Sequence, residues 1–365
     1  MPWRNEGGLI SCAVNFVPVP SGVAYSEGQE VWMPRHLPLF AGIKDVDLHT
    51  GIRRFEQFDV ARDQELVSRG NVALGLFVVK RGVLEVRIDG VVVGLAKAGD
   101  LVGEMALFRA GARGATVVAR EDSEILTLSR ANYEALRDVV HPVAQRIEAH
   151  TIAVQVRRLR EVGDRIAVLA RGQRLDKAPT RPSLFQAFRA QFGSAGFFSS
   201  EGVDPVSTMQ RSPLFRGASM EALELIAELF EEYAYAEGTI LCREGEVGTR
   251  MFLLDEGEVD VVVATGEGLQ HAATLVPGAA FGMVSLASGG DRMSTCVAKS
   301  RVVVHELSGE HWALLIGHPY GAGGTFRRAM IHAFAEHLTY ANQQLAEFER
   351  EDAVEKSNPG DASTG

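Results

Sequence analysis

An internal repeat constrains the fold of this chain more than any other feature of its sequence. Residues 75–86 align with residues 250–261 without a gap, at an offset of 175 (250 − 75). Residues 102–117 then align with residues 281–296 at an offset of 179 (281 − 102), because the intervening hairpin is longer in the second copy. Self-similarity over such lengths indicates duplicated structural units. The repeat therefore predicts two homologous domains in the 365-residue chain.

Short strands with glycine-rich turns are predicted in each copy. Apolar and charged side chains alternate from Leu84 to Asp89, with Leu84, Val86 and Ile88 on one face, which is typical of a half-buried strand. Asp89-Gly90 before three valines predicts a tight hairpin, because both turn residues tolerate positive φ. We expect a mainly β fold with α-helices: two β-barrel or jelly-roll domains, each flanked by helices.

Composition divides the chain into five predicted segments. They are an N-terminal arm (1–30), a first domain (31–171), a linker (172–208), a second domain that is degenerate (209–348) and a polar, disordered tail (349–365). A helix is expected from about 143 to 171 and another from 325 to 350, and Gly321–Phe326 is interpreted as a loop before the latter. Ile331, Leu338 and Leu345 lie seven residues apart, which suits either a homodimer seam or packing within the chain.

Composition and motifs also exclude several classes of protein. The three cysteines (Cys12, Cys242 and Cys296) are odd in number and lack a CxxC spacing, which argues against a disulfide framework and a structural zinc site. No apolar run is long enough to cross a bilayer, so we expect a cytoplasmic protein that binds no membrane. Motifs for serine hydrolysis, nucleoside triphosphate binding or zinc proteolysis are missing. We therefore expect neither an enzyme nor a metal site.

Charge is distributed unevenly along the chain, whose net charge is −10. Residues 137–190 carry eleven Lys/Arg and five Asp/Glu, a net of +6, whereas residues 201–260 carry four and fourteen, a net of −10. We interpret these opposite charges as interdomain attraction, because the basic segment has few interleaved aromatic residues and no helix-turn-helix follows. Nucleic acid is not an expected partner.

One acid and one arginine in a glycine-rich stretch form the candidate site. Gly103 followed by Glu104-Met105-Ala106-Leu107 predicts a short helical turn whose first N–H groups suit an anion. Arg113 can return to the same anion with a charge-assisted contact. The Glu104 carboxylate would instead accept hydrogen bonds from sugar hydroxyl groups. A ligand that joins a phosphate to a ribose hydroxyl satisfies both residues.

The stretch GEMALFRAGAR (103–113) resembles the phosphate-binding cassette of cyclic nucleotide-binding domains, as found in the catabolite activator protein and in regulatory subunits of cyclic-AMP-dependent kinase. This resemblance implies that Glu104 binds the ribose 2′-hydroxyl, that Arg113 binds the cyclic phosphate, and that the backbone of Gly103, Met105 and Ala106 completes the cradle. Some family members prefer cyclic GMP through a hydroxyl side chain directly after the arginine. Gly114 occupies that position here, so cyclic AMP is the expected ligand and cyclic GMP the alternative.

The second copy departs from this pattern at the acid. Gly282, Ser285 and Arg292 are the candidate residues of a weak second site, but Met283 stands where the first copy has its glutamate. A ribose hydroxyl without its acceptor costs about 1–3 kcal/mol. Asp291 is expected to compete for the charge of Arg292. We predict that the second site is weak, silent or altered in its ligand.

Two functions fit these features. The first is a cyclic nucleotide receptor that signals by ligand-induced helix movement to an effector protein, whose identity the sequence does not indicate. The alternative is a scaffold that is built from two such domains and binds no nucleotide.

Overall fold

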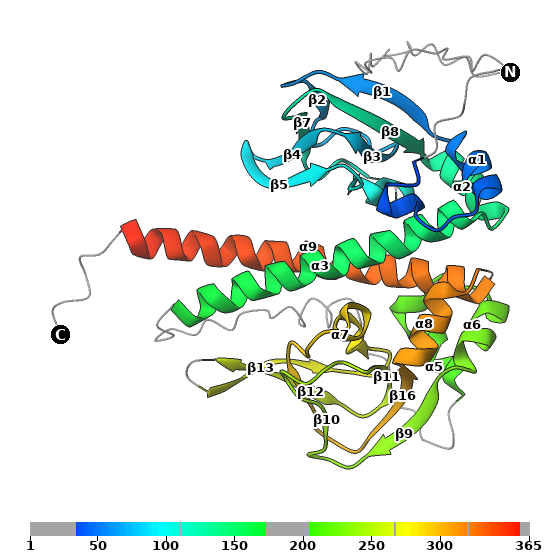
Figure 1. Ribbon diagram of the computed structural model, residues 1–365. Helices are drawn as coiled ribbons and strands as arrows, with labels where there is room; N and C mark the ends of the chain where they lie inside the picture. Colours follow the sequence, from blue (N-terminus) through cyan, green and yellow to red (C-terminus); the bar gives the residue numbers. More distant parts are fainter. Residues whose placement is uncertain (1–33, 110, 173–203, 266–267, 320, 358–365) are drawn as a thin grey trace, which may run out of the picture.

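The computed structural model describes residues 34–109, 111–172, 204–265, 268–319 and 321–357. Two β-rich units lie on opposite sides of a pair of long helices (Figure 1). We call residues 34–172 domain A and residues 204–357 domain B.

Domain A begins with short helices, continues through eight strands and ends in a long helix. Its elements are η1 (Pro38–Phe40), α1 (Asp45–Ile52), β1 (Glu56–Val60), β2 (Glu65–Val67), β3 (Gly75–Arg81), β4 (Val83–Ile88), β5 (Val91–Lys97), β6 (Leu101–Val102), η2 (Glu104–Leu107), β7 (Thr116–Ala119), β8 (Ser123–Ser129), α2 (Arg130–Asp138) and α3 (Pro142–Gly172).

The elements of domain B are α5 (Pro205–Arg211), η3 (Pro213–Phe215), α6 (Met220–Ala227), β9 (Glu231–Tyr235), β10 (Ile240–Cys242), β11 (Arg250–Glu256), β12 (Val259–Thr265), β13 (Gly268–Leu275), β14 (Ala280–Phe281), α7 (Met283–Ser288), β15 (Thr295–Ala298), β16 (Val302–Ser308), α8 (Gly309–Gly317) and α9 (Gly321–Ser357). Domain B has the same order of elements as domain A from η3 onward, with the helix α5 before it and α7 in the place of η2.

The strand order is the same in the two domains. Domain A has two four-stranded sheets, β1-β8-β3-β6 and β2-β7-β4-β5, and domain B has β9-β16-β11-β14 and β10-β15-β12-β13. Every pairing of these strands is antiparallel. The predicted fold class is confirmed in its jelly-roll form, two facing sheets rather than one closed barrel.

The predicted hairpin joins β4 to β5. Asp89 and Gly90 have φ values of 50° and 82°, as a tight turn of this type requires. The strict alternation predicted for β4 holds only in part, because a register shift between Val86 and Arg87 leaves Ile88 exposed.

The helices α3 and α9 lie side by side and run in the same direction between the two domains (Figure 1). The apolar residues Ile331, Phe334 and Leu345 of α9 are buried. These residues of the predicted coiled-coil stripe therefore pack against other parts of the same chain. Leu338, the middle residue of that stripe, is only partly buried, and the proposed homodimer stays a prediction.

Three sequence expectations around these helices need correction. Gly321–Phe326 forms the first turns of α9 rather than a loop. The predicted disordered tail is helical to Ser357, because residues 349–357 are mostly good helix formers and the first proline, Pro359, comes after the helix. The predicted linker includes the start of α5, and its residues 173–203 lie outside the described residues.

A buried ion pair joins α3 to α9. Arg327 Nε donates to Glu148 Oε2 over 2.6 Å, and each side chain is only 2% exposed. Tyr133 of α2 donates its hydroxyl to Glu148 Oε1 over 2.7 Å, and Arg328 lies 3.5 Å from the same oxygen. Burial next to this carboxylate raises the pKa of Tyr133. The carboxylate of Glu148 thus ties domain A to the last helix of domain B.

Among the described residues, no helix is both long enough and apolar enough to span a membrane. No group of three or more His, Cys, Asp or Glu side chains is placed to hold a metal ion in the same part of the chain.

Candidate functional site

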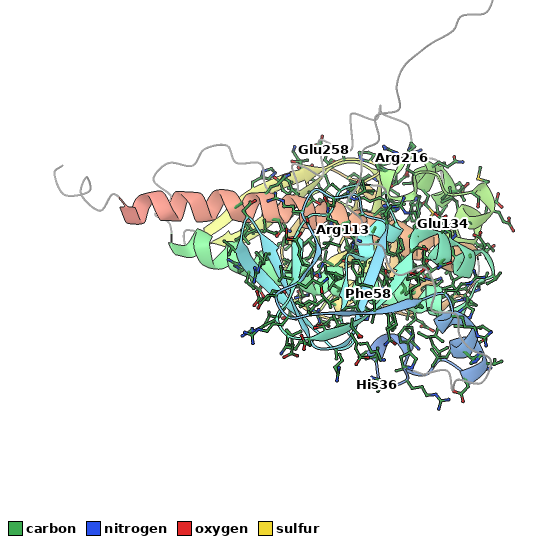
Figure 2. All side chains as sticks on the ribbon, turned by 90° about the horizontal axis from the view of Figure 1, so that it is seen from above. His36, Phe58, Arg113, Glu134, Arg216 and Glu258 are labelled. Atoms are coloured by element: carbon green, nitrogen blue, oxygen red, sulfur yellow. The ribbon has the colours of Figure 1, made fainter. Side chains whose placement is uncertain are left out.

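Arg113 is a buried cation inside domain A (Figure 2). Its Nη2 donates to the carbonyl of Gly75 over 2.7 Å and its Nη1 to the carbonyl of Gly103 over 3.3 Å. Its guanidinium carbon lies 5.1 Å from the ring centroid of Phe77, a cation–π contact. The Nε group is buried and has no hydrogen-bond partner. Burial lowers the pKa of Arg113, and the negative charge of Glu104 partly opposes this shift.

Glu104 opens η2 and is also buried, at 3% exposure. One of its carboxylate oxygens, Oε1, lies 3.2 Å from Nη1 of Arg158 on α3, whose side chain is 42% exposed. Arg113 bonds to the carbonyl of Gly103, the residue before Glu104, and the charge of Glu104 acts on it, so both side chains belong to one cassette. The structure adds a second arginine that sequence reasoning missed, because Arg158 lies 54 residues further along the chain.

Backbone geometry fixes the position of this cassette. Gly103 has a φ of 75°, and a Cβ at this residue would collide with Nη1 of Arg113, so any other residue here would strain the backbone and displace the arginine. Arg130 holds the other end of η2 through a 2.8 Å hydrogen bond from Nε to the carbonyl of Ala106. The N–H of Ala106 donates to the Gly103 carbonyl, so it is already engaged. Gly114 is exposed, and the space that a Cβ would occupy there is open, with no atom within 4 Å.

Domain B holds its arginine in the same way. Arg292 donates from Nη1 to the carbonyl of Gly282 and from Nη2 to that of Arg250, both over 2.7 Å. Its guanidinium carbon lies 5.8 Å from the ring of Phe252. Phe252 and Phe77 are 175 residues apart (252 − 77), so the aromatic contact belongs to the repeat and the alignment could have revealed it.

The acid is where the two sites differ. Met283 is buried at the start of α7 and offers no charge-bearing acceptor. Ser285 is buried on the same helix. The expected competition from Asp291 is wrong: among the described residues Asp291 makes no ion pair with Arg292, whose guanidinium turns inward to the two carbonyls.

The helix α3 contacts both cassettes. After Arg158, which meets Glu104, Arg160 donates to Ser288 Oγ over 2.8 Å and to the Asp291 carbonyl over 2.7 Å in domain B. Two closely spaced arginines of α3 therefore contact the cassettes, Arg158 in domain A and Arg160 in domain B.

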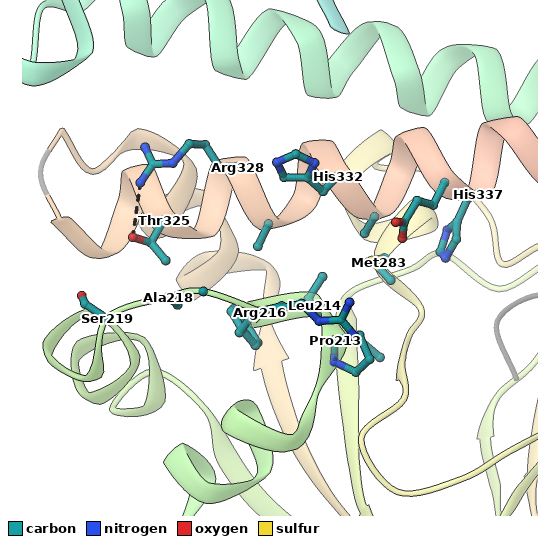
Figure 3. A pocket seen from close by; sticks show the side chains of 16 residues that line it. Pro213, Leu214, Arg216, Ala218, Ser219, Met283, Thr325, Arg328, His332 and His337 are labelled. Carbon is teal, nitrogen blue, oxygen red and sulfur yellow. Dashed lines mark hydrogen bonds between the residues drawn. The ribbon is translucent and has the colours of Figure 1, made fainter. Parts of the chain in front are cut away.

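A separate pocket of about 590 Å³ lies between η3 and α9 (Figure 3). Its lining includes Arg216, Arg328, His332 and His337, and it touches Met283, but it includes neither of the two site arginines. It is therefore separate from the site of domain A, and it meets the cassette of domain B at Met283.

Comparison with known families agrees with this geometry. The profile of the cyclic nucleotide-binding domain matches residues 57–138 and residues 232–318, once in each repeat. Each match covers the arginine cassette of its domain. The chain therefore carries two domains of the cyclic nucleotide-binding family in tandem.

Individual relatives belong to the same class. A cAMP-dependent protein kinase regulatory subunit of Blastocladiella emersonii is 23% identical over 280 residues, covering 75% of this chain and 55% of the relative. A cyclic AMP receptor protein of Thermus thermophilus is 30% identical over 109 residues, covering 30% of this chain and 50% of the relative. The chain thus matches about half the length of these curated relatives. The solved regulatory domain of Toxoplasma gondii PKA with cAMP is 19% identical at a TM-score of 0.30, covering 79% of this chain and 92% of that one.

Proposed function

We propose that this protein is a receptor for cyclic AMP, bound in domain A. In this proposal Arg113 binds the cyclic phosphate and Glu104 accepts a hydrogen bond from the ribose 2′-hydroxyl. The proposal rests on the hydrogen bonding of the buried Arg113 guanidinium. Its buried guanidinium bonds to two uncharged carbonyls, and its Nε–H has no partner. Such a group is costly unless an anion completes it, and a phosphate oxygen would do so.

The signal leaves the site through α3 in this proposal. A ribose hydroxyl bound at Glu104 donates to the same carboxylate that forms an ion pair with Arg158 in the structure. Ligand binding then changes the contact between the cassette and α3. If the ligand binds one position of α3 more tightly than another, it increases the population of that position. Arg160 follows two residues later and contacts the cassette of domain B. A shift of α3 would therefore reach both domains.

The output in this proposal is an action on another protein, without catalysis by the chain itself. Relatives from Blastocladiella emersonii, Yarrowia lipolytica and Schizosaccharomyces pombe bear the name of cAMP-dependent protein kinase regulatory subunits. A protein kinase catalytic subunit is therefore the first class of effector to test, by co-purification with and without cyclic AMP.

Titration calorimetry tests the ligand directly. Cyclic AMP should release heat and bind more tightly than cyclic GMP, with one strong site per chain. Arg113→Ala should weaken binding by about 2–5 kcal/mol, because the charged contact to the phosphate is lost. Arg292→Ala is the matched control in the other repeat and should change the strong site little. An equal loss in the two variants would refute the assignment, and no heat with either nucleotide would favour the scaffold alternative.

A further inference from the structure

Two cysteines face each other across neighbouring strands of domain B. Cys242, the last residue of β10, is the register partner of Cys296 in β15. Both thiols are free and buried, at 6% and 3% exposure. Register partners in an antiparallel pair have Cα atoms about 4.5–5.5 Å apart. Disulfides accept Cα separations of about 4.4–6.8 Å. A bond between the two sulfurs therefore fits this pair of strands.

We propose that Cys242 and Cys296 are a redox-active pair, which a small hydroperoxide oxidises to a disulfide that fastens β10 to β15 beside Arg292. This site is independent of nucleotide binding in domain A. It gives domain B a chemical property that domain A lacks.

The two thiols have different roles in this reaction. Interaction with the Cys296 thiol lowers the pKa of Cys242, burial acts against this shift, and the positive charge of Arg292 supports it. The same interaction, together with burial, raises the pKa of Cys296. Cys242 also lies on the edge strand β10, whereas Cys296 lies on the inner strand β15, so we assign Cys242 as the thiolate that attacks the oxidant. Cys296 provides the second thiol that resolves the product.

The reaction balances with one hydroperoxide per pair. The Cys242 thiolate attacks an oxygen of hydrogen peroxide, so that an S–O bond forms, the O–O bond breaks and hydroxide leaves to take up a proton. Cys296 then loses its proton and attacks the Cys242 sulfur, so that the S–S bond forms, the S–O bond breaks and water leaves. Two electrons from the thiols reduce one peroxide to two waters.

The position of β10 allows a small oxidant to enter. This strand has three residues, lies at the edge of its sheet and has a register shift between Ile240 and Cys242. Short edge strands open locally more often than central strands do. Oxidation should therefore be slower than at an exposed thiol and still proceed in the folded protein.

The other repeat provides a natural control. In domain A the equivalent partners in β2 and β7 are Val67 and Val117, in the same register. The double variant Cys242→Val/Cys296→Val thus copies a pair that the fold already accepts. It should remain folded and lose the redox reaction.

The test is peptide mapping of the full chain, reduced and then exposed to hydrogen peroxide. A Cys12→Ser background removes the third thiol. After alkylation and trypsin digestion without reductant, we expect peptide Gly217–Arg243 linked to peptide Met293–Lys299, with the link lost on addition of dithiothreitol. The oxidised chain should also unfold at a higher temperature, because a disulfide restricts the unfolded chain.

A trapping experiment separates the two steps. In Cys296→Val, dimedone should label Cys242 as its sulfenic acid, whereas Cys242→Val should leave Cys296 unlabelled. Recovery of both peptides unlinked and alkylated after peroxide would overturn the proposal. So would sulfinic acid at Cys242 in a chain that retains Cys296, because a resolving thiol in register should react first.

Discussion

The buried contact between α3 and α9 leads to the sharpest prediction about stability. Replacing Glu148 by alanine leaves the positive charge of Arg327 buried without its carboxylate. Breaking a buried ion pair from one side costs about 3–5 kcal/mol. The hydroxyl of Tyr133 also loses its acceptor, which adds about 1 kcal/mol. Arg327 keeps its hydrogen bonds to the carbonyls of Ile316 and His318, which offset part of this cost. We therefore expect the free energy of unfolding to fall by about 4 kcal/mol.

Urea unfolding of Glu148→Ala, followed by circular dichroism and tryptophan fluorescence, measures this loss. Trp312 packs edge-on against Phe326 with ring centroids 5.1 Å apart, so its emission reports on the region next to Arg327. Arg157→Ala on the same helix is the control. Its side chain is exposed and lies 4.0 Å from Glu161, an ion pair worth less than about 1 kcal/mol.

A double variant separates the charge from the packing. Glu148→Leu/Arg327→Leu removes both charges and should be more stable than Glu148→Ala, because no unpaired ion stays buried. If Glu148→Ala and Arg157→Ala unfolded at the same urea concentration, the reasoning from the buried pair would be wrong.

Three further predictions concern the site and the response to pH. Gly103→Ala should weaken nucleotide binding by about 1–3 kcal/mol, since the residue is at positive φ and its Cβ would collide with Arg113; unchanged calorimetric affinity would contradict this. Gly114→Thr has open space around it and should raise affinity for cyclic GMP relative to cyclic AMP in competition titrations, with no loss of folding. Burial lowers the pKa of His337 to about 4, below its unfolded value of about 6.5, so the unfolded chain takes up the proton first. Stability should therefore fall as pH drops from about 6.5 toward 4, and His337→Gln should show a smaller fall when unfolding is measured at both ends of that range.

The sequence predicted well what depends on local pattern. The repeat offset anticipated two units of the same topology, and Asp89-Gly90 identified its hairpin because few residues tolerate that backbone. Glu104 and Arg113 were identified together because they lie nine residues apart (113 − 104) in one glycine-rich stretch. The ligand-binding roles of Glu104 and Arg113 stay predictions, which the calorimetric titration tests.

The features that sequence reasoning missed depend on contacts between distant segments. Arg158 meets Glu104 only because α3 crosses the cassette, and the pattern of α3 does not specify which surface it covers. The apolar stripe of α9 indicated a helical seam, but nothing in the stripe identified α3 as its partner. Cys242 and Cys296 looked like unrelated residues until the register of β10 and β15 placed them opposite each other.

The parallel pair α3 and α9 has a consequence for how this molecule responds to dilution. Two separate subunits joined by such helices would dissociate as their concentration fell, and their response would change with expression level. Here both helices belong to one polypeptide, so each meets the other at an effective concentration fixed by the connecting chain. The helix pair should therefore stay assembled in even the most dilute sample.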